Sequence, residues 1–334
     1  MKLKPLEQQV LVVTGATSGI GLAVARAAAR RGAGVVLVGR DEDAVRGTTR
    51  EIESLGPRAL GIAGDVANVE EVQRIVTETE AAFGGFDTWV NNAGIAVYGR
   101  LTEVALEDQR RLFDVNYWGV VHGSLAAVRH LRHHGPGAVI NIGSVESDRS
   151  FPLNGAYAAS KHAVKAFTDA LRMEVEEASL AISVSLVKPG SIDTPLFAHA
   201  RSVMAYEPAP PPPVYAPEEV AHAVLRCAER PTRQVTVGGA GRLLTFSSAV
   251  APRLTDWAME RTLFRAQQGA PAPGGRPGNL YTPQEPHVER GSYPGRVLSR
   301  SAYTRAVLSP GWPALPFLLT GVMVGAAAAW LRRA

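Results

Sequence analysis

The chain has 334 residues, a length that suggests two domains or one large domain with an appendage. Hydrophobic residues make up 46% and charged residues 20%, a globular balance that excludes a wholly disordered chain. The formal net charge is +4, but residues from Arg265 onward carry eight arginines against two glutamates, which leaves residues 1–264 slightly acidic. A body that binds nucleic acid is therefore not expected.

Cysteine usage and the N-terminus bear on the compartment. Cys227 is the only cysteine, which excludes an internal disulfide framework and a zinc site built from cysteines. Residues 1–11 contain no apolar run of the length of a signal peptide. Both observations predict a protein of the reducing cytoplasm.

Short apolar runs alternate with helical patterns over the first 190 residues. The runs show little polar alternation, as expected of strands buried on both faces of a parallel sheet. The predicted strands are 10–13, 34–38, 60–63, 88–90, 138–142 and 182–187, and the predicted helices are 20–31, 42–55, 69–83, 107–130 and 156–177. This order predicts a Rossmann-like α/β fold, a doubly wound parallel sheet with helices on both faces.

The composition changes after this alternation ends. Residues 208–217 contain six prolines, which predicts a stiff extended loop where α/β folds often place a lid. A helix at 218–229 and a strand at 234–237 follow. Residues 265–305 are basic and rich in proline and glycine, and are interpreted as a linker or a loosely draped arm. The main folded domain is thus expected at 1–264.

Residues 306–334 are predicted to form an apolar C-terminal helix. No charged residue lies between Arg305 and Arg332, and 316–331 is continuously apolar, a length just adequate to span a bilayer. Trp312 and Trp330 stand where interfacial tryptophans are found. The favoured interpretation is a membrane anchor. The alternative is an alanine-rich helix packed on the body or on a partner in a homo-oligomer.

A glycine-rich turn follows the first predicted strand and leads into the first predicted helix. Its glycines permit a tight turn and close approach of a ligand, so that a pyrophosphate can sit at the helix N-terminus. Its position between strand and helix strengthens the prediction of a dinucleotide site. The residues assigned to this site are Gly15, Thr17, Ser18, Gly19, Ile20 and Gly21.

The next strand ends supply further candidates for the dinucleotide site. Gly39 stands where an acidic residue would hold the ribose of NAD, and Arg40 suits a 2′-phosphate, which favours NADP, with NAD still possible. The alternative is a solvated Arg40 that pairs with Asp41 or Asp43. The adenine and strand-end contacts are assigned to Asp65, Val66, Asn91, Ala93 and Gly94; for Asn91, a structural bridge between strands is at least as good an interpretation.

The strongest constellation combines Tyr157 and Lys161 with Ser144 at the end of a strand. Residues four apart share a helix face, so the tyrosine and the lysine point the same way. A free phenol titrates near about 10, and a nearby lysine cation stabilises the phenolate. Ser144 can hydrogen-bond a substrate oxygen, and Asn116 can hold a water on a proton path from Lys161. Together these residues predict acid–base chemistry.

These motifs resemble the short-chain dehydrogenases/reductases, over about residues 6–245. The resemblance implies Tyr157 as catalytic acid/base, Ser144 as the group that stabilises the substrate oxygen, and Lys161 as the residue that lowers the tyrosine pKa and binds the nicotinamide ribose. It implies that Asn116 maintains a proton relay. It adds Pro189, Gly190, Ile192 and Thr194 to the cofactor site. It says nothing about the residues beyond Arg265.

The substrate pocket is expected to be mostly apolar and aromatic, which suggests a small hydrophobic ketone or aldehyde and its alcohol. Glu146 and His199 argue against a wholly apolar pocket. The other candidates are Val97, Tyr98, Phe151, Leu153, Phe197, Met204 and Tyr206. The alternative function is a catalytically silent dinucleotide-binding sensor or scaffold at a membrane, which the intact set of Asn116, Ser144, Tyr157 and Lys161 disfavours.

Overall fold

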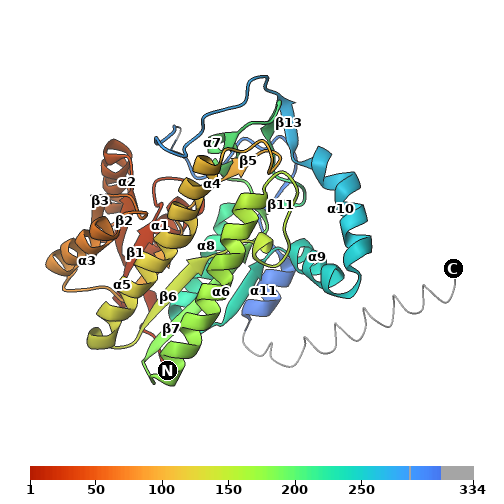
Figure 1. Ribbon diagram of the computed structural model, residues 1–334. Coiled ribbons are helices and arrows are strands. Elements are labelled where there is room, and N and C mark those ends of the chain that lie inside the picture. Colours follow the sequence, from red (N-terminus) through yellow and green to blue (C-terminus); the bar gives the residue numbers. More distant parts are fainter. Residues whose placement is uncertain (286, 310–334) are drawn as a thin grey trace.

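A seven-stranded parallel sheet forms the centre of the molecule in the computed structural model, which describes residues 1–285 and 287–309 (Figure 1). Its strand order is β12-β7-β6-β4-β1-β2-β3. The strands are β1 (Val10–Thr14), β2 (Gly34–Gly39), β3 (Ala59–Ala63), β4 (Thr88–Asn91), β6 (Gly137–Ile142), β7 (Ile182–Pro189) and β12 (Gln234–Val237). The order reverses between β1 and β4, which opens a crevice at the carboxyl ends of the strands.

Helices cover both faces of this sheet, which confirms the predicted doubly wound fold. Alternate residues of a strand point to opposite faces: Leu11 and Val13 pack toward α1, α2 and α8, whereas Val12 packs toward α3, α5 and α6. The helices are α1 (Gly19–Ala29), α2 (Glu42–Ser54), α3 (Val69–Phe83), α5 (Gly119–His134), α6 (Gly155–Glu177) and α8 (Pro217–Glu229). The two apolar clusters hold the sheet between them.

The sequence predicted one helix over 107–130, but the structure divides this segment. Helix α4 (Leu106–Phe113) is followed by a π-helical turn, η2 (Asp114–Trp118), before α5 begins. Such turns inside helices are frequent at functional sites. The periodicity of the sequence does not reveal the extra residue, because the apolar spacing stays helical on both sides. The π turn contains Asn116.

Short strands and helices follow β7 above the crevice. They are β8 (Ser191–Ile192), α7 (Leu196–His199), β9 (Arg201–Ser202), β10 (Tyr206–Pro208) and β11 (Val214–Tyr215). The proline-rich stretch is extended, as the sequence predicted. After β12 the chain forms α9 (Gly239–Val250) and α10 (Pro252–Ala266).

The segment predicted as a linker or draped arm makes defined contacts with the body. Strand β13 (Gln268–Pro271) pairs with β10, and β14 (Val297–Leu298) pairs with β11. Between them lie residues 276–285 and 287–293, here called the strap, which hydrogen-bond to the backbone of Gly19, His199 and Ser202 (Figure 1). Leu280 of the strap is fully buried. Helix α11 (Ala302–Leu308) then packs near β12 and α8.

The predicted C-terminal apolar helix lies almost wholly outside the described residues, which end at 309. Within the described part of the chain, no helix has both the length and the apolar character needed to cross a bilayer.

Candidate active site

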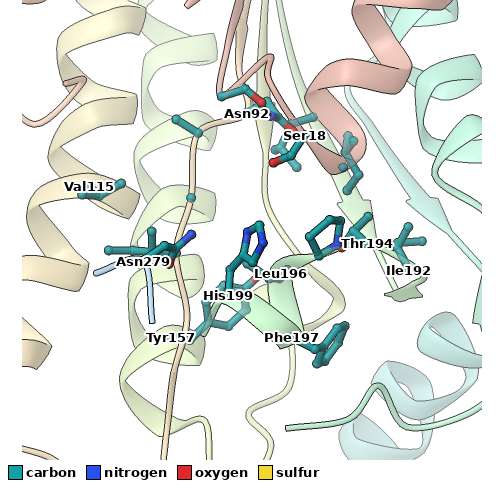
Figure 2. Close-up of a pocket in the computed structure, with 18 of the residues that line it drawn as sticks. Ser18, Asn92, Val115, Tyr157, Ile192, Thr194, Leu196, Phe197, His199 and Asn279 are labelled. Carbon is teal, nitrogen blue, oxygen red and sulfur yellow. Dashed lines mark hydrogen bonds between the residues drawn. The ribbon is translucent and has the colours of Figure 1, made fainter. Parts of the chain in front are cut away.

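One elongated cavity runs along the carboxyl edge of the sheet. The glycine-rich turn lies at one end, with Ser18 and Asn92, and Tyr157 and Phe197 lie at the other (Figure 2). Most of the predicted cofactor residues line it. These are Gly15, Thr17, Ser18, Gly19, Ile20, Arg40, Asp65, Val66, Ala93, Gly94, Tyr157, Lys161, Pro189, Gly190, Ile192 and Thr194.

Two predicted cofactor residues do not line this cavity. A Cβ on Gly21 would lie 2.0 Å from the carbonyl oxygen of Gly15, so this glycine permits helix α1 to pack on the turn. Asn91 is buried among strands: its Nδ2 donates to Asn141 Oδ1 at 2.8 Å, and its Oδ1 accepts from Trp89 Nε1 at 2.7 Å. The assignment of Asn91 to the cofactor is therefore corrected to the structural bridge.

The neighbouring Asn92, whose amide was expected to bridge strand ends and was not assigned to the cofactor, does line the cavity. Its Nδ2 donates to the carbonyl oxygens of Thr14 and Gly15 at 2.9 and 3.1 Å. These bonds fix the turn after β1 against the end of β4. The two adjacent asparagines are indistinguishable in the sequence, and only their alternate directions on the strand end separate their roles.

Arg40 and Asp65 stand where the adenosine end of a dinucleotide is expected. The guanidinium of Arg40 donates to the backbone carbonyl oxygens of Asn279 and Leu280 in the strap, at 2.5 and 3.4 Å. Burial lowers the pKa of Arg40, while the charge of Asp65 opposes this shift. Asp65 forms an ion pair with Arg111. Burial of Asp65 raises its carboxyl pKa, but hydrogen bonds from Ala67 N–H and Arg111 outweigh it and the pKa is lowered.

Among the residues that it describes, the structure does not pair Arg40 with Asp41 or Asp43, the alternative that the sequence left open. Asp41 caps helix α2 by accepting from Ala44 N–H at 2.9 Å, and Asp43 pairs with Arg46 at 2.7 Å. Within the described chain neither carboxylate pairs with Arg40. The partner of Arg40 is the strap, which the sequence analysis did not assign to the site.

The strap closes one wall of the cavity through Asn279, Pro283, Gln284 and His287. The N–H of Gly19, at the start of α1, donates to the carbonyl oxygen of Val288 at 2.9 Å. His287 Nε2 lies 3.3 Å from Asp41 Oδ2. No local spacing could have found these residues, because about 240–270 positions separate them from the elements they contact.

Tyr157 and Lys161 lie one turn apart on helix α6, both buried, as their spacing predicted. Lys161 Nζ donates to the carbonyl oxygen of Ile142 at 2.9 Å and lies 5.6 Å from the centre of the Tyr157 ring. Burial lowers the lysine pKa to about 8. Ser144, at the end of β6, accepts the N–H of Glu146 at 3.1 Å, which leaves its own hydroxyl hydrogen to donate.

The tyrosine hydroxyl has a pKa above its ordinary value. Burial is the main cause, the nearby carboxyl group of Glu146 adds to it, and a hydrogen bond with Ser144 opposes it. The expected lowering by Lys161 is not among these causes; here Ser144 is the group that lowers the pKa. Burial and the Glu146 carboxyl group thus both favour the neutral phenol, the form that can donate a proton.

Asn116 does not line the cavity but ties its parts together. Its Oδ1 accepts from Ile95 N–H at 2.9 Å, and its Nδ2 donates to Ile95 O at 2.9 Å and to Ser160 Oγ at 3.2 Å. The side chain therefore fixes the loop after β4 to helix α6. Asn116 lies within the π turn η2.

The substrate end contains some of the predicted pocket residues. Tyr98, Glu146, Phe151, Phe197 and His199 line the cavity. Val97, Leu153, Met204 and Tyr206 do not line it, and Tyr206 is exposed. Gln267 and Pro211 line it without having been predicted. Both come from segments that reach the site only through the fold.

Comparisons with known proteins agree with this geometry. Residues 9–204 match the family model described as short chain dehydrogenase. An uncharacterized oxidoreductase, YxnA, of Bacillus subtilis is 40% identical over 99% of this chain and 92% of its own length. The 3beta-hydroxysteroid dehydrogenase 1 of Eggerthella lenta is 37% identical over 69% of this chain and 90% of its own.

Two solved structures are similar in fold. An alcohol dehydrogenase from the archaeon Thermococcus sibiricus, complexed with 5-hydroxy-NADP, has a TM-score of 0.61 and 27% identity, and the match covers 69% of this chain and 95% of that one. The L-sorbose reductase from Gluconobacter frateurii, complexed with NADPH and L-sorbose, has a TM-score of 0.61 and 29% identity, over 71% and 96% of the two chains.

Proposed function

Because the chain belongs to the short-chain dehydrogenase family, we propose that it is an NADP(H)-dependent oxidoreductase that interconverts a hydrophobic ketone or aldehyde and its alcohol. The observation that carries the proposal is the buried set of Ser144, Tyr157 and Lys161 at the end of a cavity that begins at a glycine-rich turn. A binding scaffold has no need to bury a lysine against a tyrosine.

The side chains of this set divide the work of carbonyl reduction. The hydride would come from NADPH bound along the cavity. Ser144 donates its hydroxyl hydrogen to the carbonyl oxygen, and Tyr157 transfers the phenolic proton to that oxygen as the negative charge develops. Lys161, held by Ile142 O, lies beside the tyrosine ring, and we propose that its charge stabilises the phenolate as it forms, an effect that the pKa of Tyr157 in the unreacted site does not include. Asn116 holds the loop after β4 against helix α6 through its hydrogen bonds to Ile95 and Ser160.

The residues of the cavity fit a dinucleotide. A Cβ on Gly15 would lie 2.9 Å from the Cα of Ala93, so glycine permits the close packing of the turn that lines the cavity. Arg40 supports NADP over NAD. Its guanidinium, at the end of β2, matches the 2′-phosphate of NADP, and the position where an acidic residue would bind the ribose of NAD is occupied by Gly39. The NADP(H) complexes of the two similar structures support the same preference.

One observation favours the alternative of a catalytically silent dinucleotide-binding scaffold. Backbone carbonyl oxygens of the strap accept hydrogen bonds from the N–H of Gly19 and from the guanidinium of Arg40. The phosphates of a bound dinucleotide would use the same two donors. An enzyme with this strap must release those donors when its cofactor binds. A scaffold could keep them engaged.

A turnover assay separates the two candidates. The purified chain is mixed with NADPH or NADH and a panel of alkyl and aryl ketones and aldehydes, and cofactor oxidation is followed by absorbance. We expect oxidation of NADPH with at least one apolar carbonyl compound. Tight binding of NADPH without turnover of any compound would favour the scaffold and overturn the proposed activity.

We also propose that the C-terminal apolar residues attach the catalytic domain to a membrane, with the domain on the cytoplasmic side. The support is the sequence alone: an uncharged run between Arg305 and Arg332 with a tryptophan near each end.

A further inference from the structure

Two side-chain oxygen atoms in the substrate end of the cavity have no hydrogen-bond partner within residues 1–285 and 287–309. They are Glu146 Oε2 and Asn154 Oδ1, and His199 Nε2 is a third unpartnered atom of the cavity lining. Glu146 is 7% exposed and Asn154 is 1% exposed, and both line the cavity. A buried polar group without a partner costs about 1–3 kcal/mol, so a native structure retains it chiefly where a ligand uses it.

The two side chains form one unit. Asn154 Nδ2 donates to Glu146 Oε1 at 3.2 Å, which turns the remaining oxygen of each group away from that bond. Glu146 Oε1 and Asn154 Nδ2 are thus engaged by each other, whereas Oε2 and Oδ1 stay free for a third group. Other buried asparagines of the fold differ: Asn91 and Asn141 are bonded through both ends of their amides.

This pair lies beside the reacting groups. Glu146 follows Ser144 by two residues, and Asn154 precedes Tyr157 by three. The carboxyl group of Glu146 raises the pKa of both Tyr98 and Tyr157, although burial is the larger cause in each case. Such an effect requires proximity. Ser144, Glu146, Asn154 and Tyr157 all line the same cavity, so a molecule whose carbonyl oxygen is bound by Ser144 and Tyr157 can also reach the pair.

The rest of this end of the cavity is largely apolar. Ile95, Phe151, Leu196 and Phe197 line it, together with the ring of Tyr98. A bound substrate with no second polar group would leave Glu146 Oε2 and Asn154 Oδ1 buried against carbon atoms, without a hydrogen-bond partner. A substrate with one suitably placed polar group would satisfy them and still fill the apolar space.

We propose that Glu146 and Asn154 bind a hydroxyl group of the substrate, so that the preferred substrate is an apolar ketone or aldehyde with a hydroxyl a few bonds from the carbonyl carbon. This inference rests on the proposed carbonyl reduction and names its substrate class. Glu146 and Asn154 are specificity residues, and Ser144 and Tyr157 do the chemistry.

A hydroxyl fits this pair better than an ammonium group does. Burial raises the pKa of Glu146 to about 8, so at neutral pH the carboxyl group is protonated and Oε2 can donate. Asn154 Oδ1 can only accept. A hydroxyl accepts from the one and donates to the other, whereas an ammonium group can only donate.

The test compares matched substrate pairs. The substrates are an alkyl methyl ketone and its derivatives with a hydroxyl on successive carbons, and acetophenone and its α-hydroxy derivative. With NADPH, we expect at least a ten-fold higher kcat/KM for one hydroxylated member over its parent. A site built for a hydroxyl rejects the analogue that lacks it by up to about 10⁴–10⁵-fold. If no hydroxylated member is preferred, the proposal is wrong.

Variants assign the preference to the pair. Glu146→Leu and Asn154→Leu should each lower the hydroxylated-to-parent ratio of kcat/KM at least ten-fold. Glu146→Gln keeps the shape and a neutral hydrogen-bonding end, so most of the ratio should remain. Glu53→Leu, which changes an exposed glutamate on α2, is the control. A ratio that is the same in Glu146→Leu and Glu53→Leu would overturn the assignment.

Two further outcomes keep the inference separate from the proposed function. If no ketone is reduced, the reduction proposal fails, and calorimetric titration with an alkane-1,2-diol and the matching secondary alcohol decides the inference: equal affinities overturn it, and tighter diol binding supports it. A preference for an amino ketone that Glu146→Gln abolishes would identify an ammonium site and overturn the hydroxyl assignment.

Discussion

Tyr157 and Glu146 share one buried end of the cavity, and both hold their protons for the same reason. Burial disfavours the charged form of each acid, so both pKa values rise. Lys161 is affected in the opposite direction, since burial disfavours the ammonium form and lowers its pKa to about 8. The result is a site rich in neutral proton donors, suited to reduction of a carbonyl group.

Removal of the Tyr157 hydroxyl tests the acid role. In Tyr157→Phe the ring still fills its place on α6, but the proton donor is lost, so kcat should fall by about 10²-fold or more. NADPH affinity, measured by fluorescence titration, should change little. A variant with near-normal turnover would contradict the mechanism.

Arg40→Asp tests whether Arg40 binds the 2′-phosphate of NADP. A carboxylate would repel a 2′-phosphate and could accept the hydroxyls of a ribose, so the NADPH-over-NADH ratio of kcat/KM should fall at least ten-fold, about 1.4 kcal/mol. Arg46→Asp on the exposed face of α2 is the control. If the ratio is unchanged, Arg40 acts only on the strap.

The pKa of Glu146 predicts a pH dependence of stability. The folded value is about 8 and the ordinary value is 4.5, so between these pH values the unfolded chain releases a proton that the folded chain keeps. The free energy of unfolding should therefore fall as pH rises, by at most about 1.4 kcal/mol per pH unit from this group.

Urea denaturation at pH 5 and pH 8 measures this effect. Glu146→Gln cannot ionise, so its stability should fall less over that range than the stability of the wild-type chain. Lys161 contributes in a separate window, above its folded pKa of about 8. Equal losses in both proteins would show that Glu146 is ionised in the folded state.

At the scale of elements, the strap has a structure that its composition did not predict. Its proline and glycine content suggested a linker, yet it contacts the glycine-rich turn, Arg40 and Asp41. The contact is anchored by Leu280, which packs in an apolar cluster with Val66, Tyr98 and Tyr157. Ion pairs of Glu289 with Arg26 and of Arg290 with Glu218 lie near its end. Burial of Leu280 therefore helps to hold in place a segment whose proline and glycine content is typical of mobile linkers.

Leu280→Ala should loosen the strap. The lost burial and the cavity left behind cost about 2–5 kcal/mol in well-packed sites, and the strap has few other buried side chains to replace that energy. Limited proteolysis should then cleave within residues 276–293 faster than in the wild type. Leu55→Ala, at an exposed leucine after α2, should leave the cleavage rate unchanged. Equal cleavage in both variants would mean that backbone pairing alone holds the strap.

At the scale of the whole molecule, a folded catalytic body precedes an apolar C-terminal run. Residues 312–331, fused behind a cytosolic reporter, should carry the reporter to membranes, because the run is long enough to span and has a tryptophan near each end. Leu318→Arg with Val322→Arg should release it, since each charge costs about 2.5–3.5 kcal/mol near a helix centre on insertion scales. Cell fractionation measures both. A reporter that stays unbound with the native run would favour the packed-helix alternative.

The sequence by itself determined the doubly wound fold, the glycine-rich turn and the Ser144, Tyr157 and Lys161 set. Each depends on local order: apolar runs mark buried strands, glycines mark a turn between strand and helix, and a spacing of four places two side chains on one helix face. Only the tertiary structure decided that Asn92 rather than Asn91 lines the cavity, because one step along a strand end reverses the direction of a side chain.

The tertiary structure alone also decided the partner of Arg40, the pairing of Glu146 with Asn154, and the pKa of each buried acid. The strap reaches Arg40 across about 240 residues, and such long-range contacts leave no periodic trace in the sequence. Burial sets the pKa values, and burial depends on which distant segments cover a group. The chemistry of this protein was therefore visible in its motifs, whereas the surroundings that tune that chemistry exist only in the folded chain.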